Sequence, residues 1–279
     1  MNLPLRAAIE RYNLVRDEVQ AHAPTQWIEV GSLCRDVPTA IDVAAVWAHG
    51  RDKPCWSHIK VEAGRRIASD LTLTPDFESH QVIASDAWDI KMIARGRDWK
   101  SNSNFDVRGA SAQTFVTRLQ RGGLASYRWR LFAIRELALS LCREDGALGM
   151  VNVLGAAGHR LPARDIHPWA KRFAKVAGMG WGATTVDHML TDLGLSVKPD
   201  IHLRRSAVRM GLFSPDVPSN LPDQEIEGLT SALDPRAVEA IVELSEHIAP
   251  TAYPAAGSAL REIDKVLMEW SRQGLLRPL

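Results

Sequence analysis

The spacing of apolar residues constrains this chain most, because it repeats with the period of an α-helix along most of the sequence. In residues 4–21, for example, Leu5, Ile9, Tyr12 and Val19 fall near one side of a helix. The same period predicts further helices over 37–49, 58–69, 111–120, 126–143, 147–157, 166–177, 183–193, 201–210, 223–232, 235–248 and 256–273. Residues 70–86 are ambiguous, and the polar segment 95–110 is expected to be a loop. We therefore expect an all-α protein arranged as two helical lobes.

Composition favours a soluble protein of one large or two smaller domains. The chain has 279 residues, of which 46% are hydrophobic and 24% are charged. No apolar run approaches the ~20 residues that span a bilayer. The first twenty residues carry charges in every turn and so lack the apolar core of a signal peptide. We expect a cytoplasmic protein, a monomer, with no membrane partner.

Neither the cysteines nor the histidines predict a metal or a cofactor. The 3 cysteines, Cys34, Cys55 and Cys142, are far apart, and no pair has the spacing of metal ligands. No run of four cysteines exists that would hold an iron–sulfur cluster. We expect no metal site and no cofactor.

Basic residues are concentrated in two segments although the formal net charge is only +1. One segment runs from Arg121 to Arg135 and the other from Lys198 to Arg209, and each contains four basic residues. A basic face on a neutral protein fits contact with phosphates. Solvated helix faces would give the same pattern, so both interpretations remain open.

A glycine-rich turn joins two predicted helices at Gly178-Met179-Gly180-Trp181-Gly182. Glycines permit a tight reversal and bring backbone N–H groups close to a partner. The helix that follows begins near Ala183 and offers unpaired N–H groups at its start. Together these features predict an anion site suited to a phosphate. Helical hairpins also use glycine only to turn, so a structural role stays open.

Asp200 follows Lys198 and Pro199 at the start of another predicted helix. An aspartate at this position caps the helix by accepting hydrogen bonds from its first N–H groups. A functional role is compatible with capping if the helix end fixes the carboxylate while the carboxylate still faces a cleft.

The sequences GMGWGATT and VKPDIHLRRSAVRMGL together resemble the helix-hairpin-helix DNA glycosylases, a superfamily that includes endonuclease III and the alkylpurine glycosylases. The resemblance covers residues 173–213, extends loosely back to about 121, and does not include the first 110 residues. The family's catalytic aspartate corresponds to Asp200. Its hairpin corresponds to Val176–Thr184, within a helix-hairpin-helix at about 166–193.

The resemblance implies a two-lobed helical glycosylase fold with its active site in the cleft between the lobes. One lobe would span about 111–213, and residues 1–110 with 214–279 would form the second. Double-stranded DNA is the implied partner. The implied DNA-binding residues are Gly178, Gly180, Trp181, Gly182, Thr184, His202 and Arg204.

Gly182 departs from the bifunctional members of the family, which carry a lysine at the corresponding position. That lysine forms a Schiff base with the sugar, and no amine is present here. We therefore expect a monofunctional DNA glycosylase, which hydrolyses the N-glycosidic bond with water and leaves an abasic site, without lyase activity.

Such an enzyme must extrude its target base and hold it in a pocket. Trp99, in the polar loop, and Tyr127 are the candidates for a pocket wall or a wedge. Arg97, Lys100 and Asn102 lie near Trp99 in the sequence and suit contacts to phosphates or base edges.

Two other classes of function remain open. The chain could be a non-catalytic helix-hairpin-helix DNA-binding protein in which Asp200 only caps a helix, or a helical scaffold in which GMGWG is a plain turn. For a glycosylase, the sequence does not select the excised base. Damaged bases would indicate base repair, and modified phage bases would indicate defence.

Overall fold

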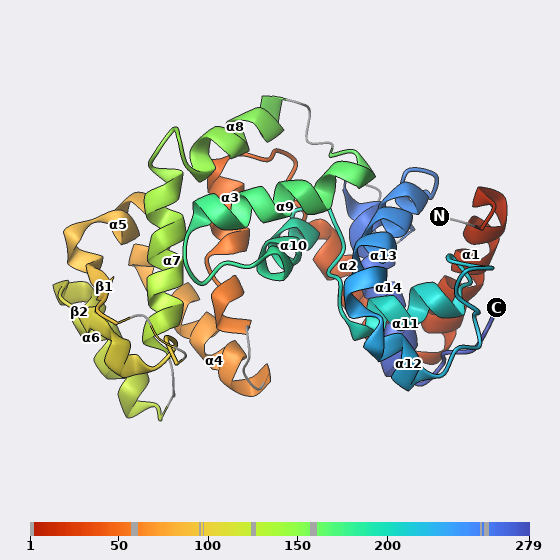
Figure 1. Ribbon diagram of the computed structural model, residues 1–279, viewed down its shortest axis with the longest axis horizontal. Helices are drawn as coiled ribbons and strands as arrows, with labels where there is room; N and C mark the ends of the chain where they lie inside the picture. The colour runs from red at the N-terminus through yellow and green to blue at the C-terminus, as the bar shows by residue number, and fades with distance from the viewer. Residues whose placement is uncertain are drawn as a thin grey trace. The chain divides into compact units, whose positions relative to one another are not determined.

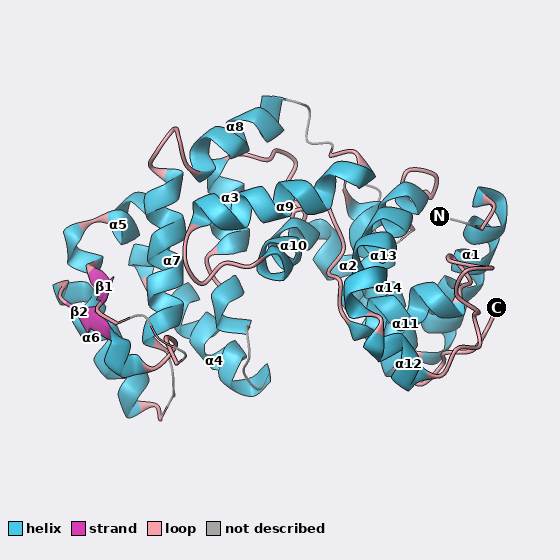
Figure 2. Ribbon diagram, viewed as in Figure 1, coloured by secondary structure: helices cyan, strands magenta, loops and turns pink. Residues whose placement is uncertain are grey.

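The computed structural model of the chain describes residues 3–56, 61–94, 96, 98–123, 127–156, 161–251, 253 and 257–279 (Figure 1). Helices make up most of these residues, which confirms the helical class expected from the sequence (Figure 2). Within these ranges no helix combines the length and the apolar character that crossing a membrane requires.

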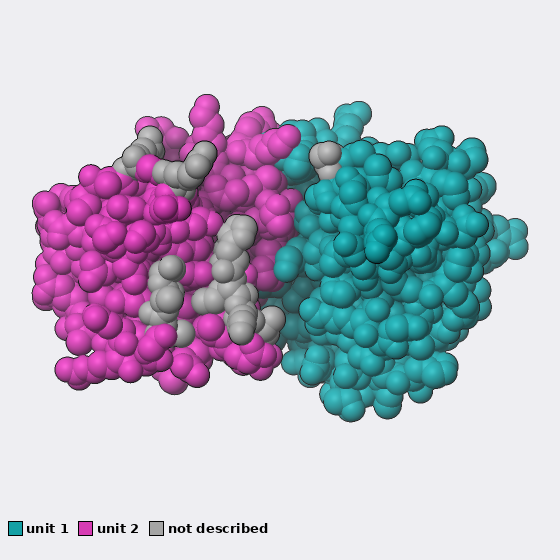
Figure 3. All heavy atoms as spheres, turned by 60° about the horizontal axis from the view of Figure 1, so that its bottom comes forward, with its two compact units in different colours: residues 1–39, 160–169, 190–279 teal, residues 40–159, 170–189 magenta. Residues whose placement is uncertain are grey.

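The chain divides into two compact units, coloured separately in Figure 3. Unit 1 consists of Met1–Thr39, Arg160–Trp169 and Leu190–Leu279, and unit 2 consists of Ala40–His159 and Ala170–Met189. These boundaries differ from the expected ones at 111 and 213. Each unit combines segments that are distant in the sequence, and helix α9 (Ala163–Ala177) contributes to both.

Unit 1 is built around helix α14 (Ser258–Arg272). The apolar side chains of Ile263, Leu267 and Trp270 are completely buried there. Glu262 and Lys265 are also buried, and Lys265 pairs with Glu269 one turn further on, at 2.8 Å. The helices that complete this unit are α1 (Leu5–His22), α2 (Pro24–Arg35), α11 (Ile201–Arg209), α12 (Asp223–Gly228) and α13 (Thr230–Ser245).

Unit 2 is built around helix α7 (Arg128–Leu141), whose side chains Ala133, Ile134 and Leu137 are fully buried. The longer elements around it are α3 (Val43–Gly50), α4 (Val61–Thr72), α5 (His80–Ala84), α6 (Ala110–Arg121), α8 (Ala147–Ala156) and most of α10 (Ala183–Asp192). The described residues of unit 2 also form four short 3-10 helices, at Lys53–Trp56, Pro75–Glu78, Asp86–Trp88 and Asn102–Asn104.

The described part of segment 95–110 contains a strand, which the sequence did not predict. Strand β2 (Phe105–Val107) pairs antiparallel with β1 (Ile90–Met92), and Ile90 lies opposite Val107 (Figure 2). Phe105 is buried and contacts the ring of Phe132 on α7 at 5.4 Å between centroids. The pair of strands therefore packs against the core of unit 2 through Phe105.

Candidate functional site

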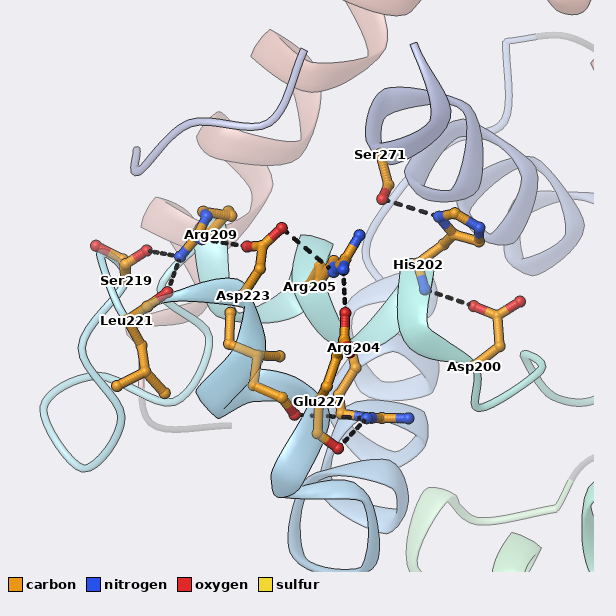
Figure 4. A network of polar contacts seen from close by, with 11 residues as sticks. Asp200, His202, Arg204, Arg205, Arg209, Ser219, Leu221, Asp223, Glu227 and Ser271 are labelled. Atoms are coloured by element: carbon orange, nitrogen blue, oxygen red, sulfur yellow. Dashed lines mark hydrogen bonds and ion pairs between the residues drawn. The ribbon is translucent and has the colours of Figure 1, made fainter. Parts of the chain in front are cut away.

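Asp200 caps the N-terminus of α11 in unit 1, as its sequence context predicts. Its Oδ1 accepts hydrogen bonds from the backbone N–H of His202 at 2.9 Å and of Leu203 at 3.0 Å. No described residue donates a hydrogen bond to its Oδ2, which points away from the helix end in Figure 4. The half-buried carboxylate is thus fixed through one oxygen, and the other oxygen remains available.

The segment before Asp200 is anchored by a buried carboxyl that the sequence analysis did not single out. Asp264 on α14 accepts a hydrogen bond from the Lys198 backbone N–H at 3.3 Å. Arg261, also on α14, binds Asp264 at 3.1 Å and Asp192 at 2.8 Å. These contacts attach the chain on both sides of the loop 193–197 to α14 and so limit the movement of Asp200.

Two further carboxyl groups, Asp234 and Asp264, lie close enough to Asp200 to interact with its charge. Burial raises the pKa of Asp264 to about 6, and the charge of Asp200 contributes to this increase. Burial also raises the pKa of Asp234, again with a contribution from Asp200. Each of the two is paired with an arginine, Asp234 with Arg204 at 2.5 Å and Asp264 with Arg261 at 3.1 Å, so the arginine offsets its charge.

His202 lies in the first turn of α11, and its Nδ1 is 3.0 Å from the hydroxyl of Ser271. Burial lowers the pKa of His202, which favours the neutral ring at pH 7 although Asp200 opposes the shift. A neutral ring offers a phosphate no positive charge. Contact between His202 and DNA therefore stays a prediction.

Arg204 is directed into unit 1 and is only 6% exposed. Its Nε donates to Asp234 at 2.5 Å, and its Nη1 donates to the carbonyls of Ile226 and Glu227. This guanidinium holds α11 to α12 and α13, so its expected contact with DNA conflicts with its position. The sequence could not indicate this, because the partners lie more than twenty residues away.

The other arginines of the basic segment Lys198–Arg209 are also paired with acids inside unit 1 (Figure 4). Arg205 pairs with Glu227 and with Asp223, and Arg209 pairs with Asp223 at 2.5 Å. Arg209 also donates to the carbonyls of Ser219 and Leu221. These pairs neutralise most of the positive charge that suggested a phosphate-binding face in this segment.

The glycine-rich turn lies in unit 2, between α9 and α10, and packs against α7. Gly178 and Gly180 both have φ of 97°, a conformation that favours glycine. A β-carbon at Gly180 would lie 2.5 Å from Cβ of Ala133, and one at Gly178 would lie 2.8 Å from Oε2 of Glu136. Both glycines are therefore required by the backbone and by the close approach to α7.

Several backbone N–H groups of this turn remain available for an anion. The N–H groups of Gly178, Gly180, Gly182, Ala183 and Thr184 donate to no residue that the structure describes. The carboxylate of Glu136 accepts a hydrogen bond from the backbone of Met179, and burial raises the pKa of Glu136. The turn thus already binds one carboxylate, and its other N–H groups could bind a phosphate.

Trp181 and Thr184 differ in their positions in the turn. Trp181 is 8% exposed, and its indole Nε1 donates to the carbonyl of Ala133 at 2.8 Å, so it packs within the hairpin. Thr184 and Gly182 are exposed, and no atom lies within 4 Å of a β-carbon built at Gly182. The position that carries a lysine in bifunctional glycosylases is therefore open and empty of an amine.

The two aromatic candidates for a base pocket are both in unit 2. Tyr127 is 3% exposed and belongs to the core at the start of α7. Trp99 is half-buried and meets the ring of Trp129 edge-on at 5.9 Å between centroids. Asn102 accepts a hydrogen bond from the Arg128 backbone at 3.0 Å, and Arg97 lies outside the described residues.

Among the residues with described positions, no group of three or more histidine, cysteine, aspartate or glutamate side chains is arranged to hold a metal ion. Cys34 and Cys55 are buried free thiols, and Cys142 is an exposed one. Burial raises the pKa of the Cys34 thiol to about 12, so this thiol is protonated and unreactive at neutral pH.

Comparison with known proteins returned no match, whether with models of protein families, with curated proteins or with solved structures.

Proposed function

We propose that the chain is a monofunctional DNA glycosylase in which Asp200 is the catalytic residue. It would hydrolyse the N-glycosidic bond of an extruded base in double-stranded DNA and leave an abasic site. The proposal combines the resemblance of residues 173–213 to the helix-hairpin-helix glycosylases with the geometry of Asp200 and of the glycine-rich turn.

One observation carries the proposal: the capped carboxylate of Asp200 keeps a free oxygen. The two N–H donors at the helix start fix Oδ1, and Oδ2 has no donor among the described residues. A residue that serves only as a helix cap needs one oxygen. A catalytic carboxylate needs a fixed position and a second oxygen that no protein group occupies, and Asp200 has both within the described part of the chain.

The chemistry of base excision suits such a group. Breaking the bond between base and sugar builds positive charge on the deoxyribose, and a fixed anion close to it stabilises that charge. The free oxygen of Asp200 can also orient the attacking water and accept its proton.

The glycine-rich turn supports the DNA-binding part of the proposal. Its available N–H groups lie at the start of α10, where the helix dipole favours an anion. Gly182 supplies no amine, so water is the nucleophile and the DNA backbone stays intact after base release.

The test is to incubate the protein with duplexes that carry alkylated, deaminated, oxidised or bulky modified bases. Released bases are identified by mass, and alkali then cleaves the strand at abasic sites. We expect one class of base to be released, with strand breaks only after alkali. Tight, salt-sensitive DNA binding without release of any base would instead support the non-catalytic DNA-binding protein.

A further inference from the structure

Two cations approach the ring of Trp129 in unit 2. Lys100 Nζ lies 4.6 Å from the ring centroid, and the guanidinium carbon of Arg130 lies 4.4 Å from it. Lys100 Nζ is also 5.6 Å from the centroid of the Trp99 ring. Trp99 and Lys100 are half-buried, whereas Arg130 is only 3% exposed.

Lys100 has no acidic counter-ion in the described part of the chain. Its pKa is lowered by burial and, secondly, by the positive charge of Arg130, and no acid offsets either effect. By contrast, two other basic residues of unit 2 have an acidic partner, since Lys91 and Arg135 both pair with Asp89, at 3.6 Å and 3.3 Å. The environment of Lys100 is therefore electropositive, although acids are available elsewhere in the same unit.

A half-buried lysine beside a second cation is unfavourable unless an anion binds there. The ring faces offset part of this cost, because each attracts a cation, but they do not remove the repulsion between the two charges. We propose that Lys100 and Trp99, packed on the buried Trp129 and beside the buried charge of Arg130, form a binding site for a phosphate of nucleic acid. This inference rests on the proposed function, which supplies DNA as the partner.

The composition of the cluster favours a nucleotide phosphate over other anions. Lys100 provides a compact positive charge of the kind that binds phosphates, and Arg130 adds a second charge to the field. The half-buried ring of Trp99 beside Lys100 provides apolar surface for the sugar or base attached to that phosphate. A free nucleotide presents the same chemistry, so the experiment must separate a free nucleotide from DNA.

The experiment measures the affinity for a labelled DNA duplex by fluorescence anisotropy over a series of salt concentrations. The variants are Lys100→Gln, which removes the charge, Lys100→Arg, which keeps it, and the control Lys91→Gln at an exposed lysine of the same unit. Circular dichroism and thermal unfolding establish that each variant is folded. A parallel titration with a nucleoside monophosphate tests the free nucleotide.

We expect Lys100→Gln to weaken DNA binding about fivefold at 0.15 M salt and to reduce the slope of log affinity against log salt by about 0.9, the effect of one phosphate contact. Lys100→Arg should keep most of the slope, and Lys91→Gln should match wild type. Equal affinities and slopes for Lys100→Gln and Lys91→Gln would overturn the inference. An effect confined to the nucleoside monophosphate would overturn the assignment to DNA.

The two proposals fail in different ways. If wild type binds DNA with the expected loss in Lys100→Gln but releases no base, only the glycosylase proposal is lost. If Asp200→Asn stops base release while Lys100→Gln binds DNA as wild type does, only the phosphate site is lost. Absence of DNA binding by wild type would refute both.

Discussion

Replacing Arg204 with methionine separates a structural role from contact with DNA. The guanidinium is 6% exposed and makes three hydrogen bonds, one to Asp234 and two to carbonyls at the end of α12. Methionine fills much of the same volume but leaves the Asp234 carboxylate half-buried without its partner. Breaking a buried ion pair by removing one member costs about 3–5 kcal/mol, and we expect about 3 kcal/mol because Asp234 is partly exposed.

Urea unfolding followed by circular dichroism measures this loss. The matched control is Arg6→Met, because Arg6 forms an exposed pair with Glu10 at 3.0 Å on α1 of the same unit. Exposed pairs of this kind contribute roughly 0.3–0.5 kcal/mol. The loss of unfolding free energy caused by Arg204→Met should be smaller at pH 5 than at pH 7. The pKa of Asp234 is already raised by burial and rises further without Arg204, so the unpaired carboxyl is protonated more readily at low pH.

A loss of less than about 1 kcal/mol in Arg204→Met, combined with weaker DNA binding, would contradict this reasoning. That result would mean that the guanidinium leaves Asp234 and contacts the phosphates, as the resemblance implies. A large loss of stability with unchanged DNA affinity in the folded fraction is the result that the geometry predicts.

Four further substitutions test the turn and the carboxyl group of Asp264. The pKa of Asp264 rises from 3.8 to about 6 on folding, so its ionisation opposes folding. Between pH 4 and pH 7 the free energy of unfolding of wild type should therefore fall by about 2 kcal/mol relative to that of Asp264→Asn, as measured by urea unfolding. Gly180→Ala should destabilise the protein by at least about 2 kcal/mol, because φ is 97° and Ala133 is 2.5 Å from the added carbon, whereas Gly182→Ala should change stability by less than about 1 kcal/mol. Borohydride should trap a covalent complex between abasic DNA and Gly182→Lys but not wild type; trapping of wild type would refute the monofunctional assignment.

The helical period predicted most helices because each is amphipathic in its own sequence. Residues 201–210 were expected to be helical, and α11 spans Ile201–Arg209, since Asp200 fixes its start and Leu203, Ala207 and Val208 are buried along one face. The expected break between 223–232 and 235–248 is misplaced. Helix α13 begins at Thr230 and continues through Pro235, which lies inside the helix and leaves one helical hydrogen bond unmade.

Elements without a clear local pattern were missed. Helix α2, Pro24–Arg35, was not predicted, and Ile28 within it is 73% exposed, so its apolar residues do not form one clean stripe. Strands β1 and β2 have three residues each, and their pairing joins segments more than ten residues apart. Strands this short contain no repeating pattern of apolar residues from which the pairing could be predicted.

The candidate site was predictable where its chemistry is local. The cap at Asp200 and the glycines of positive φ in the turn follow from short sequence motifs. The roles of Arg204 and Asp264 depend on partners 30 and 66 residues away, so the sequence alone could not assign them. Lys100 was noted for its neighbours in the loop, whereas the second cation beside it comes from α7.

The most direct test of the central claim compares single-turnover base release by wild type, Asp200→Asn and Asp42→Asn. Asparagine also caps helices well, so both substitutions should preserve the fold. Asp42 is a matched control because it caps α3 by accepting a hydrogen bond from Ala45 at 2.8 Å. We predict that Asp200→Asn slows release about 10²–10³-fold and that Asp42→Asn releases base at the wild-type rate. Release by Asp200→Asn at the wild-type rate would contradict the account.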